Sequence, residues 1–101
     1  MNSAEVVIDG VSGYKHDKHY QAGDYEGQHY HKVSTKITVV FSRKVRMVAS
    51  TWIEGDIITL KPGEITDFMA LSNAITVVVK VPGALGDKHC PEVNTVVLLS
   101  I

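Results

Sequence analysis

Two histidines, His29 and His31, are the side chains whose types and spacing most clearly indicate chemistry. They end the segment 23–31, which has the composition of an extended strand. In a β-strand, residues i and i+2 point to the same face, so the two imidazoles are expected to lie side by side. Such a pair could form half of a metal site, an acid–base pair, or a hydrogen-bonding edge for a polar ligand.

The elements that must position this pair are short runs of β-branched and apolar residues. Strands are expected at residues 5–9, 36–41, 44–49, 56–60, 74–80 and 94–101. Glycine, proline and asparagine separate these runs, a pattern typical of an all-β sandwich or barrel. The remaining segments carry no convincing helical period, which disfavours βαβ architectures. Residues 11–28 are expected to hold one irregular strand and a loop, and residues 49–54, around Trp52, a hairpin loop.

Length and composition limit the classes of protein to which the chain can belong. Its 101 residues are 45% hydrophobic and carry a net charge of −1, so we expect one packed domain over residues 1–101. Without a basic stripe or a long apolar run, we expect no nucleic-acid or membrane partner. The first ten residues lack the pattern of a signal peptide, and the single cysteine, Cys90, cannot form an internal disulfide. A cytoplasmic location is therefore expected.

Two spaced patterns carry a resemblance to a known family. Gly23 is followed after five residues by the pair His29 and His31, and the dipeptide 55–56 is followed after four residues by Lys-Pro-Gly at 61–63. In this order, over roughly residues 23–80, the patterns resemble the two motifs of the cupin superfamily. The residues around the histidines are most similar to RmlC-like cupins of sugar and nucleotide-sugar metabolism. The resemblance implies a double-stranded β-helix, or jelly-roll barrel, with the functional site inside the barrel mouth.

The same resemblance implies four ligands to a divalent metal, and this chain departs from that set. The family takes two histidines and a glutamate from the first motif and one histidine from the second. Here His29 and His31 match, but Lys36 stands at the glutamate position and Thr66 at the second-motif histidine. A protonated lysine repels a cation and cannot coordinate it, so the sequence disfavours a standard cupin metal site.

Three functions remain open from these residues, and whether the protein is an enzyme is open with them. In the first, His29 and His31 act as a metal-free acid–base pair while Lys36 stabilises a developing oxyanion or holds an anionic group. The resemblance then implies isomerase- or epimerase-like chemistry next to a sugar carbonyl. In the second, the chain is a non-catalytic ligand-binding or regulatory module.

The third function is that of a metal-dependent enzyme with rearranged ligands. Zinc, nickel, manganese or iron would be held by His29, His31 and Asp67. This arrangement needs a bulge or register shift, because Thr66 and Asp67 face opposite ways in a regular strand.

The ligand and the oligomeric state are also predicted. Tyr25 and Tyr30 are expected to stack on a sugar face and Thr66 to hydrogen-bond it, so a carbohydrate-derived small molecule is the favoured ligand class. The β-branched segments 5–9 and 94–101 are expected to pair with a second copy at a sheet edge, which predicts a homodimer.

Overall fold

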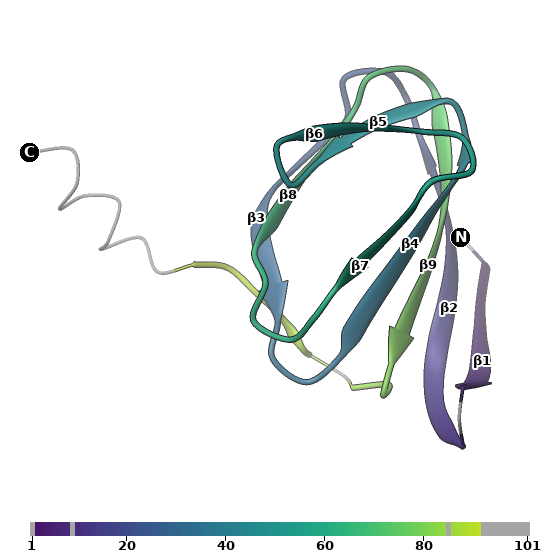
Figure 1. The fold of residues 1–101 in the computed structure, drawn as a ribbon, viewed down its shortest axis with the longest axis vertical. Helices are drawn as coiled ribbons and strands as arrows, with labels where there is room; N and C mark the ends of the chain where they lie inside the picture. Colours follow the sequence, from purple (N-terminus) through teal and green to yellow (C-terminus); the bar gives the residue numbers. More distant parts are fainter. Residues whose placement is uncertain (1, 9, 85, 92–101) are drawn as a thin grey trace, which may run out of the picture.

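Two five-stranded antiparallel sheets form the chain into an open-ended barrel (Figure 1). The computed structural model describes residues 2–8, 10–84 and 86–91. One sheet has the strand order β1-β2-β9-β4-β7 and the other β10-β3-β8-β5-β6. Within these described ranges, no helix is long and apolar enough to cross a membrane. The all-β, double-stranded β-helix prediction is confirmed.

The strand bounds follow the turn residues of the sequence. The first sheet contains β1 (Asn2–Ile8), β2 (Val11–Tyr20), β4 (Thr35–Ser42), β7 (Ile57–Leu60) and β9 (Ala74–Val81). The second sheet contains β3 (Tyr25–His31), β5 (Lys44–Met47), β6 (Ser50–Ile53), β8 (Thr66–Ala70) and β10 (Lys88–His89). The expected strand at 94–101 lies outside the described residues.

The structure differs from the sequence-based strand predictions at two places. Residues 11–20 form the ten-residue strand β2, which pairs with β1 on one side and β9 on the other, instead of one irregular strand and a loop. Its inward positions include His16 and Lys18, so the apolar–polar alternation that marks a strand is missing. Residues 50–53, expected in a hairpin loop, form β6, which pairs with β5, and the Trp52 indole donates to the Met47 carbonyl at 2.9 Å.

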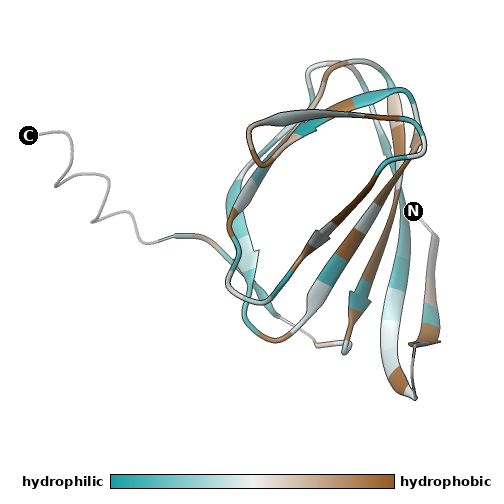
Figure 2. Ribbon diagram, viewed as in Figure 1, coloured by the Kyte–Doolittle hydropathy of each residue, from teal (hydrophilic) through white to brown (hydrophobic). Residues whose placement is uncertain are grey.

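The barrel interior changes from polar at one end to apolar at the other. Along β4 the buried side chains run from Lys36 through Thr38 to Val40, and β9 runs from Lys80 to the buried Ala74 in the opposite direction. The hydropathy colouring shows the same change along these strands (Figure 2). The hydrophobic core comprises Val40, Val45, Met47, Ile58, Leu60, Phe68, Ala70 and Ala74. This core closes one end of the barrel and leaves the polar end for a site.

Candidate functional site

His29 and His31 lie side by side on the inner face of β3. Both are buried, with 1% and 6% of their surface exposed, and their ring centroids are 6.1 Å apart in an edge-to-face arrangement. His29 lies opposite Thr66 in β8, and His31 lies opposite Lys88 in β10. The structure therefore brings together the two imidazoles that their spacing predicted.

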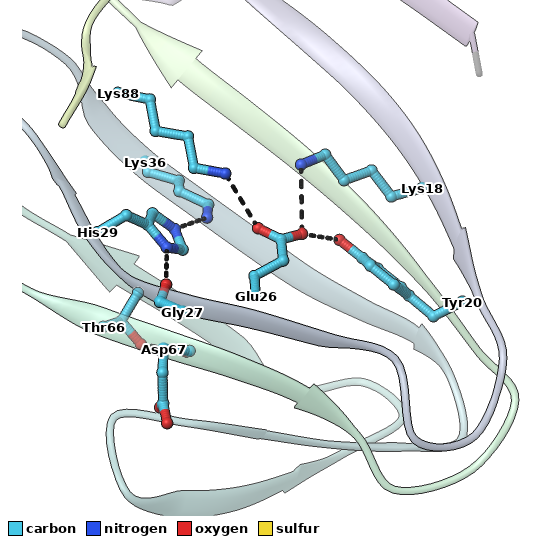
Figure 3. A network of polar contacts seen from close by, with 9 residues as sticks. All are labelled: Lys18, Tyr20, Glu26, Gly27, His29, Lys36, Thr66, Asp67 and Lys88. Carbon is cyan, nitrogen blue, oxygen red and sulfur yellow. Dashed lines mark hydrogen bonds and ion pairs between the residues drawn. The ribbon is translucent and has the colours of Figure 1, made fainter. Parts of the chain in front are cut away.

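The backbone and a lysine define the proton arrangement on His29. Nδ1 lies 2.9 Å from the Gly27 carbonyl oxygen, which can only accept, so this nitrogen carries the proton in the neutral ring. Nε2 then carries a lone pair and can accept a hydrogen bond, and the Lys36 Nζ lies 3.4 Å from this nitrogen (Figure 3). Burial lowers the pKa of His29, and the charge of Lys36 lowers it further. A neutral imidazole thus accepts from a buried ammonium.

Lys36 points into the barrel, as its alignment with the cupin glutamate position predicted. It is 6% exposed, and this burial, with the charge of Lys18 next in importance, lowers its pKa to about 8. An amine with this pKa can hold or release a proton near neutral pH. The lysine therefore has the protonation properties of an acid–base group.

Glu26 joins the site although sequence reasoning missed it. Its Oε1 accepts from the Tyr20 hydroxyl at 3.1 Å, and its Oε2 accepts from Lys88 at 3.3 Å (Figure 3). Lys18 lies 4.0 Å from Oε1. Burial acts to raise the pKa of Glu26, but the charges of Lys18 and Lys88 outweigh it, and the pKa falls below its usual value.

A β-bulge places Glu26 inside the barrel. Strict alternation would put Glu26 and His29, three residues apart, on opposite faces. Between them the β3–β8 register shifts, because Glu26 pairs with Phe68 and His29 with Thr66. Three steps along β3 therefore match two along β8, and both side chains face inward. Gly27, a glycine inside a predicted strand, was the available signal.

A cavity of about 380 Å³ opens at the polar end of the barrel. Its walls include Tyr14, His16, His31, Lys80, Asp87 and Lys88. The Nε2 atom of His31 is buried and has no hydrogen-bond partner among the described residues. Burial, together with the charges of Lys80 and Lys36, lowers the pKa of His31 to about 4, so its ring is neutral at neutral pH. This cavity is called the mouth cavity below.

Asp87 holds one wall of the mouth cavity in place. Its carboxylate accepts from the backbone N–H groups of Lys32 and Val33 at 3.1 Å and of Ser34 at 2.9 Å. Burial acts to raise the pKa of Asp87, but these backbone hydrogen bonds lower it overall. The carboxylate thus connects the segment before β10 to the turn between β3 and β4.

A small void lies deeper in the barrel, beside Lys36. The void lined by Tyr20, Glu26, Lys36 and Phe68 has a volume of about 10 Å³, which is room for about one water molecule. His29 and Lys36 are not among the residues that line the mouth cavity. A ligand would therefore contact His31 first, and the His29–Lys36 pair would lie behind it.

The predicted ligand-binding residues are not at the mouth cavity. Tyr25 is 55% exposed, and Tyr30 stacks on His89 with ring centroids 5.5 Å apart. Tyr25 is the neighbour of the inward-facing Glu26, and Tyr30 lies between the inward-facing His29 and His31. Because side chains alternate along a strand, both tyrosines lie on the outer face. The Thr66 hydroxyl is occupied, because it accepts from the Val48 N–H at 3.1 Å and donates to a backbone carbonyl at 2.7 Å. Tyr14, which the prediction omitted, lines the cavity instead.

The donors present do not fit the divalent metal that the cupin resemblance implies. Asp67 was the expected third ligand, but its carboxylate points away from His29 (Figure 3) and lies 3.9 Å from Arg46. To turn Asp67 toward His29, a bulge would be needed in β8, but the bulge lies in β3. The side chains of β8 alternate regularly, so Asp67 faces the side opposite Thr66. Lys36 already contacts the Nε2 of His29. In the described part of the chain, no three His, Cys, Asp or Glu side chains are grouped to hold a metal ion.

Comparisons with solved structures agree with this architecture. An uncharacterised conserved protein with a double-stranded β-helix domain from Klebsiella pneumoniae is similar with a TM-score of 0.72 and 22% identity, over 87% of this chain and 76% of that one. KdgF from Halomonas sp. is similar with a TM-score of 0.63 and 13% identity, over 79% and 76% of the two chains. An RmlC-like cupin from Shewanella frigidimarina has a TM-score of 0.63 and 16% identity, over 74% and 68%.

No family model matches the sequence, and no curated protein matches it significantly. The structural similarities, at these levels of identity, establish the fold. The chain has a double-stranded β-helix fold, which is similar to the fold of these RmlC-like cupin and double-stranded β-helix proteins.

Proposed function

We propose that this cupin-fold protein binds a small, carbohydrate-derived molecule in the mouth cavity, with the His31 imidazole as a direct contact. The observation that carries the proposal is the buried Nε2 of His31, which lies in the wall of a cavity of about 380 Å³ and has no hydrogen-bond partner among the described residues. Ligand pockets of this kind combine a preformed concave volume with a few fixed polar groups. Tyr14 adds an aromatic ring of the type that packs against sugars.

We further propose that the protein moves a proton next to a sugar carbonyl, as an isomerase or epimerase does, without a metal. The proposal is supported by the contact of 3.4 Å between the His29 Nε2, which can accept a proton, and the Lys36 amine, whose pKa is about 8. An acid–base group works best when its pKa is near the working pH. His31 lines the cavity and its ring centroid is 6.1 Å from that of His29, so His31 would connect the ligand to the pair.

A non-catalytic binding module is the second candidate function. It is favoured by the position of His29 and Lys36 outside the lining of the mouth cavity, and by the void beside Lys36, which holds only about one water molecule. In this case the ligand contacts His31 and the residues of the cavity wall, and no proton is exchanged. The two functions therefore differ in one measurable property.

Proton exchange in D₂O distinguishes the two functions. Glucose, fructose and their 6-phosphates would be incubated with the protein, and loss of the proton next to the carbonyl followed by ¹H NMR. For an isomerase, His29→Gln should slow this exchange roughly 100-fold, the usual contribution of a general base. His19→Gln is the matched control, because His19 is exposed and lies opposite Ile75 on the outer face of β2.

The outcomes assign the function as follows. Exchange that is lost in His29→Gln but kept in His19→Gln supports the isomerase. Binding at the mouth cavity without exchange supports the module. Neither binding nor exchange across a wide sugar library contradicts both.

We also propose that the protein is a homodimer. The outer face of β4, β7 and β9 carries apolar side chains, because Val39 lies opposite both Ile57 and Val77. Ile57 is 61% exposed. An exposed apolar face that extends over three neighbouring strands is typical of a protein–protein contact surface. The segment 5–8 supports the same proposal, since among the described strands it lies in β1 at an edge of the sheet.

A further inference from the structure

Four lysines point into the polar end of the barrel from four different strands. They are Lys18 of β2, Lys36 of β4, Lys80 of β9 and Lys88 of β10. Their charges act on one another, because burial and the other lysines together lower the pKa of Lys36 and of Lys80. Lys36 and Lys80 are direct cross-strand partners in the β4–β9 ladder. Like charges placed directly opposite each other destabilise a sheet.

The carboxylates at this end do not balance the lysines. Glu26 is shared between Lys18 and Lys88, and Asp87 is occupied by three backbone N–H groups. Four lysines and two carboxylates leave a surplus of two positive charges there, whereas the whole chain has a net charge of −1. The positive charge is therefore concentrated at the barrel mouth.

The groups that line the mouth cavity have unused hydrogen-bonding capacity. Lys80 forms no ion pair or hydrogen bond with the residues that the structure describes. The buried Nε2 of His31 is likewise without a partner in this part of the chain, and in one neutral tautomer it is a donor. Lys88 reaches Glu26 at 3.3 Å but keeps half of its side chain exposed, with two further donor hydrogens.

We infer that the ligand of the mouth cavity carries a carboxylate or phosphate group, and that this group binds between Lys80, Lys88 and His31. This rests on the proposed small-molecule function and specifies its ligand class as a sugar acid or sugar phosphate. Carboxylate and phosphate oxygens accept strong, charge-assisted hydrogen bonds from lysine. An anion here would also relieve the repulsion between Lys36 and Lys80.

A titration with charged and neutral sugars tests the inference. The probes are gluconate, glucose 6-phosphate, inorganic phosphate and neutral glucose, each followed by ¹H–¹⁵N correlation spectra at constant ionic strength. The amides of Gly86 and Lys88 report on the cavity wall. We expect the sugar anions to bind at least roughly tenfold more tightly than glucose. Inorganic phosphate should shift the same amides, and comparison of gluconate with glucose 6-phosphate identifies the favoured anion.

A matched pair of variants locates the anion. Lys80→Gln should weaken anion binding at least roughly tenfold, and should weaken anion binding more than it weakens glucose binding. Lys15→Gln makes the same charge change on β2, where Lys15 lies next to the cavity residues Tyr14 and His16 but on the outer face, and should leave both affinities unchanged. Thermal unfolding of both variants checks that they fold, and removing one of two opposed lysines should not lower stability.

Each other outcome overturns the inference. If glucose binds at the cavity as tightly as the anions, the ligand is not an anion, and the proposed small-molecule site survives. If Lys15→Gln weakens anion binding as much as Lys80→Gln, the anions bind by overall charge and not at this site. If none of the three anions shifts the cavity amides, the anion site does not exist. The titration with neutral glucose then shows by itself whether the cavity binds a sugar.

Discussion

At the scale of single residues, the most consequential side chain is Lys36. By the resemblance to the cupin motifs, it stands where that family has a glutamate, and in the structure it contacts the His29 imidazole. Its burial is unfavourable for the fold, because an ammonium loses hydration there without gaining a carboxylate partner of its own. A residue that costs stability in this way is typical of a functional site.

Replacing Lys36 with methionine should stabilise the protein at neutral pH. The lowering of the Lys36 pKa from 10.5 to about 8 corresponds to about 3 kcal/mol of destabilisation at pH 7. The folded protein loses this proton near pH 8 and the unfolded chain near pH 10.5, so the unfolded state binds more protons between these values. The stability of the wild type therefore rises with pH across this window, and the advantage of Lys36→Met disappears by its upper end.

Urea unfolding at pH 7 and at pH 10 measures this difference. Lys61→Met is the control, because Lys61 is exposed in the turn after β7 and should give no pH-dependent gain. A Lys36→Met protein that is less stable than the wild type at pH 7 would contradict the assigned burial of a charged amine.

At the scale of elements, the β5–β6 hairpin carries local backbone strain. Its two turn residues, Val48 and Ala49, have φ values of +49° and +55°. Two consecutive residues with positive φ are typical of a type I′ turn, which matches the twist of paired strands and favours Asn-Gly. A β-branched residue at positive φ is unfavourable, so the hairpin is held by its strand pairing rather than by its turn sequence.

The double substitution Val48→Asn and Ala49→Gly should therefore stabilise the protein. Residues suited to left-handed backbone remove the strain, and we expect a gain of about 1 kcal/mol in the free energy of unfolding. Chemical denaturation followed by Trp52 fluorescence measures it, since Trp52 lies in β6 next to the turn. Unchanged or lower stability would mean that the Val48 side chain contributes packing that exceeds the strain.

The β3 bulge is the element that assembles the polar network. Without it, Glu26 would face solvent and leave Lys18 and Lys88 without their shared carboxylate. The bulge also lets Glu26 and both histidines share one face of a single strand. One irregular position thus determines which charges enter the barrel.

At the scale of the whole molecule, the two ends of the barrel and its outer face have distinct roles. The apolar end supplies the packed core, while the polar end accepts the uncompensated lysines and the cavity. The apolar outer face of β4, β7 and β9 is suited to a second copy of the chain. Site and subunit contact would therefore lie on different surfaces.

Ile57→Lys should shift the proposed dimer toward the monomer. Ile57 would be covered in the proposed dimer, so its loss and the introduction of a charge should raise the dimer dissociation constant roughly tenfold or more. Sedimentation velocity across a range of concentrations measures it. Ile53→Lys is the matched control, because Ile53 is 54% exposed but belongs to the other sheet. A wild type that stays monomeric at high concentration, or equal effects of both variants, would refute the proposed contact face.

The sequence by itself determined the all-β architecture, most of the strands and the shared inner face of His29 and His31. These features depend on local periodicity and turn residues, which a short window of sequence contains. The cupin resemblance placed Lys36 at an inward position, but the sequence left an outward position equally open, and the structure shows that Lys36 is buried inside the barrel.

Only the tertiary structure decided which other groups join the histidines. Glu26 enters through a bulge, and Lys80 meets Lys36 through pairing between strands more than forty residues apart. The same long-range packing turned Asp67 and both predicted tyrosines outward and left a cavity beside His31. A one-residue register change moves a side chain to the opposite face, and register depends on the partner strand, so local sequence could not determine these positions.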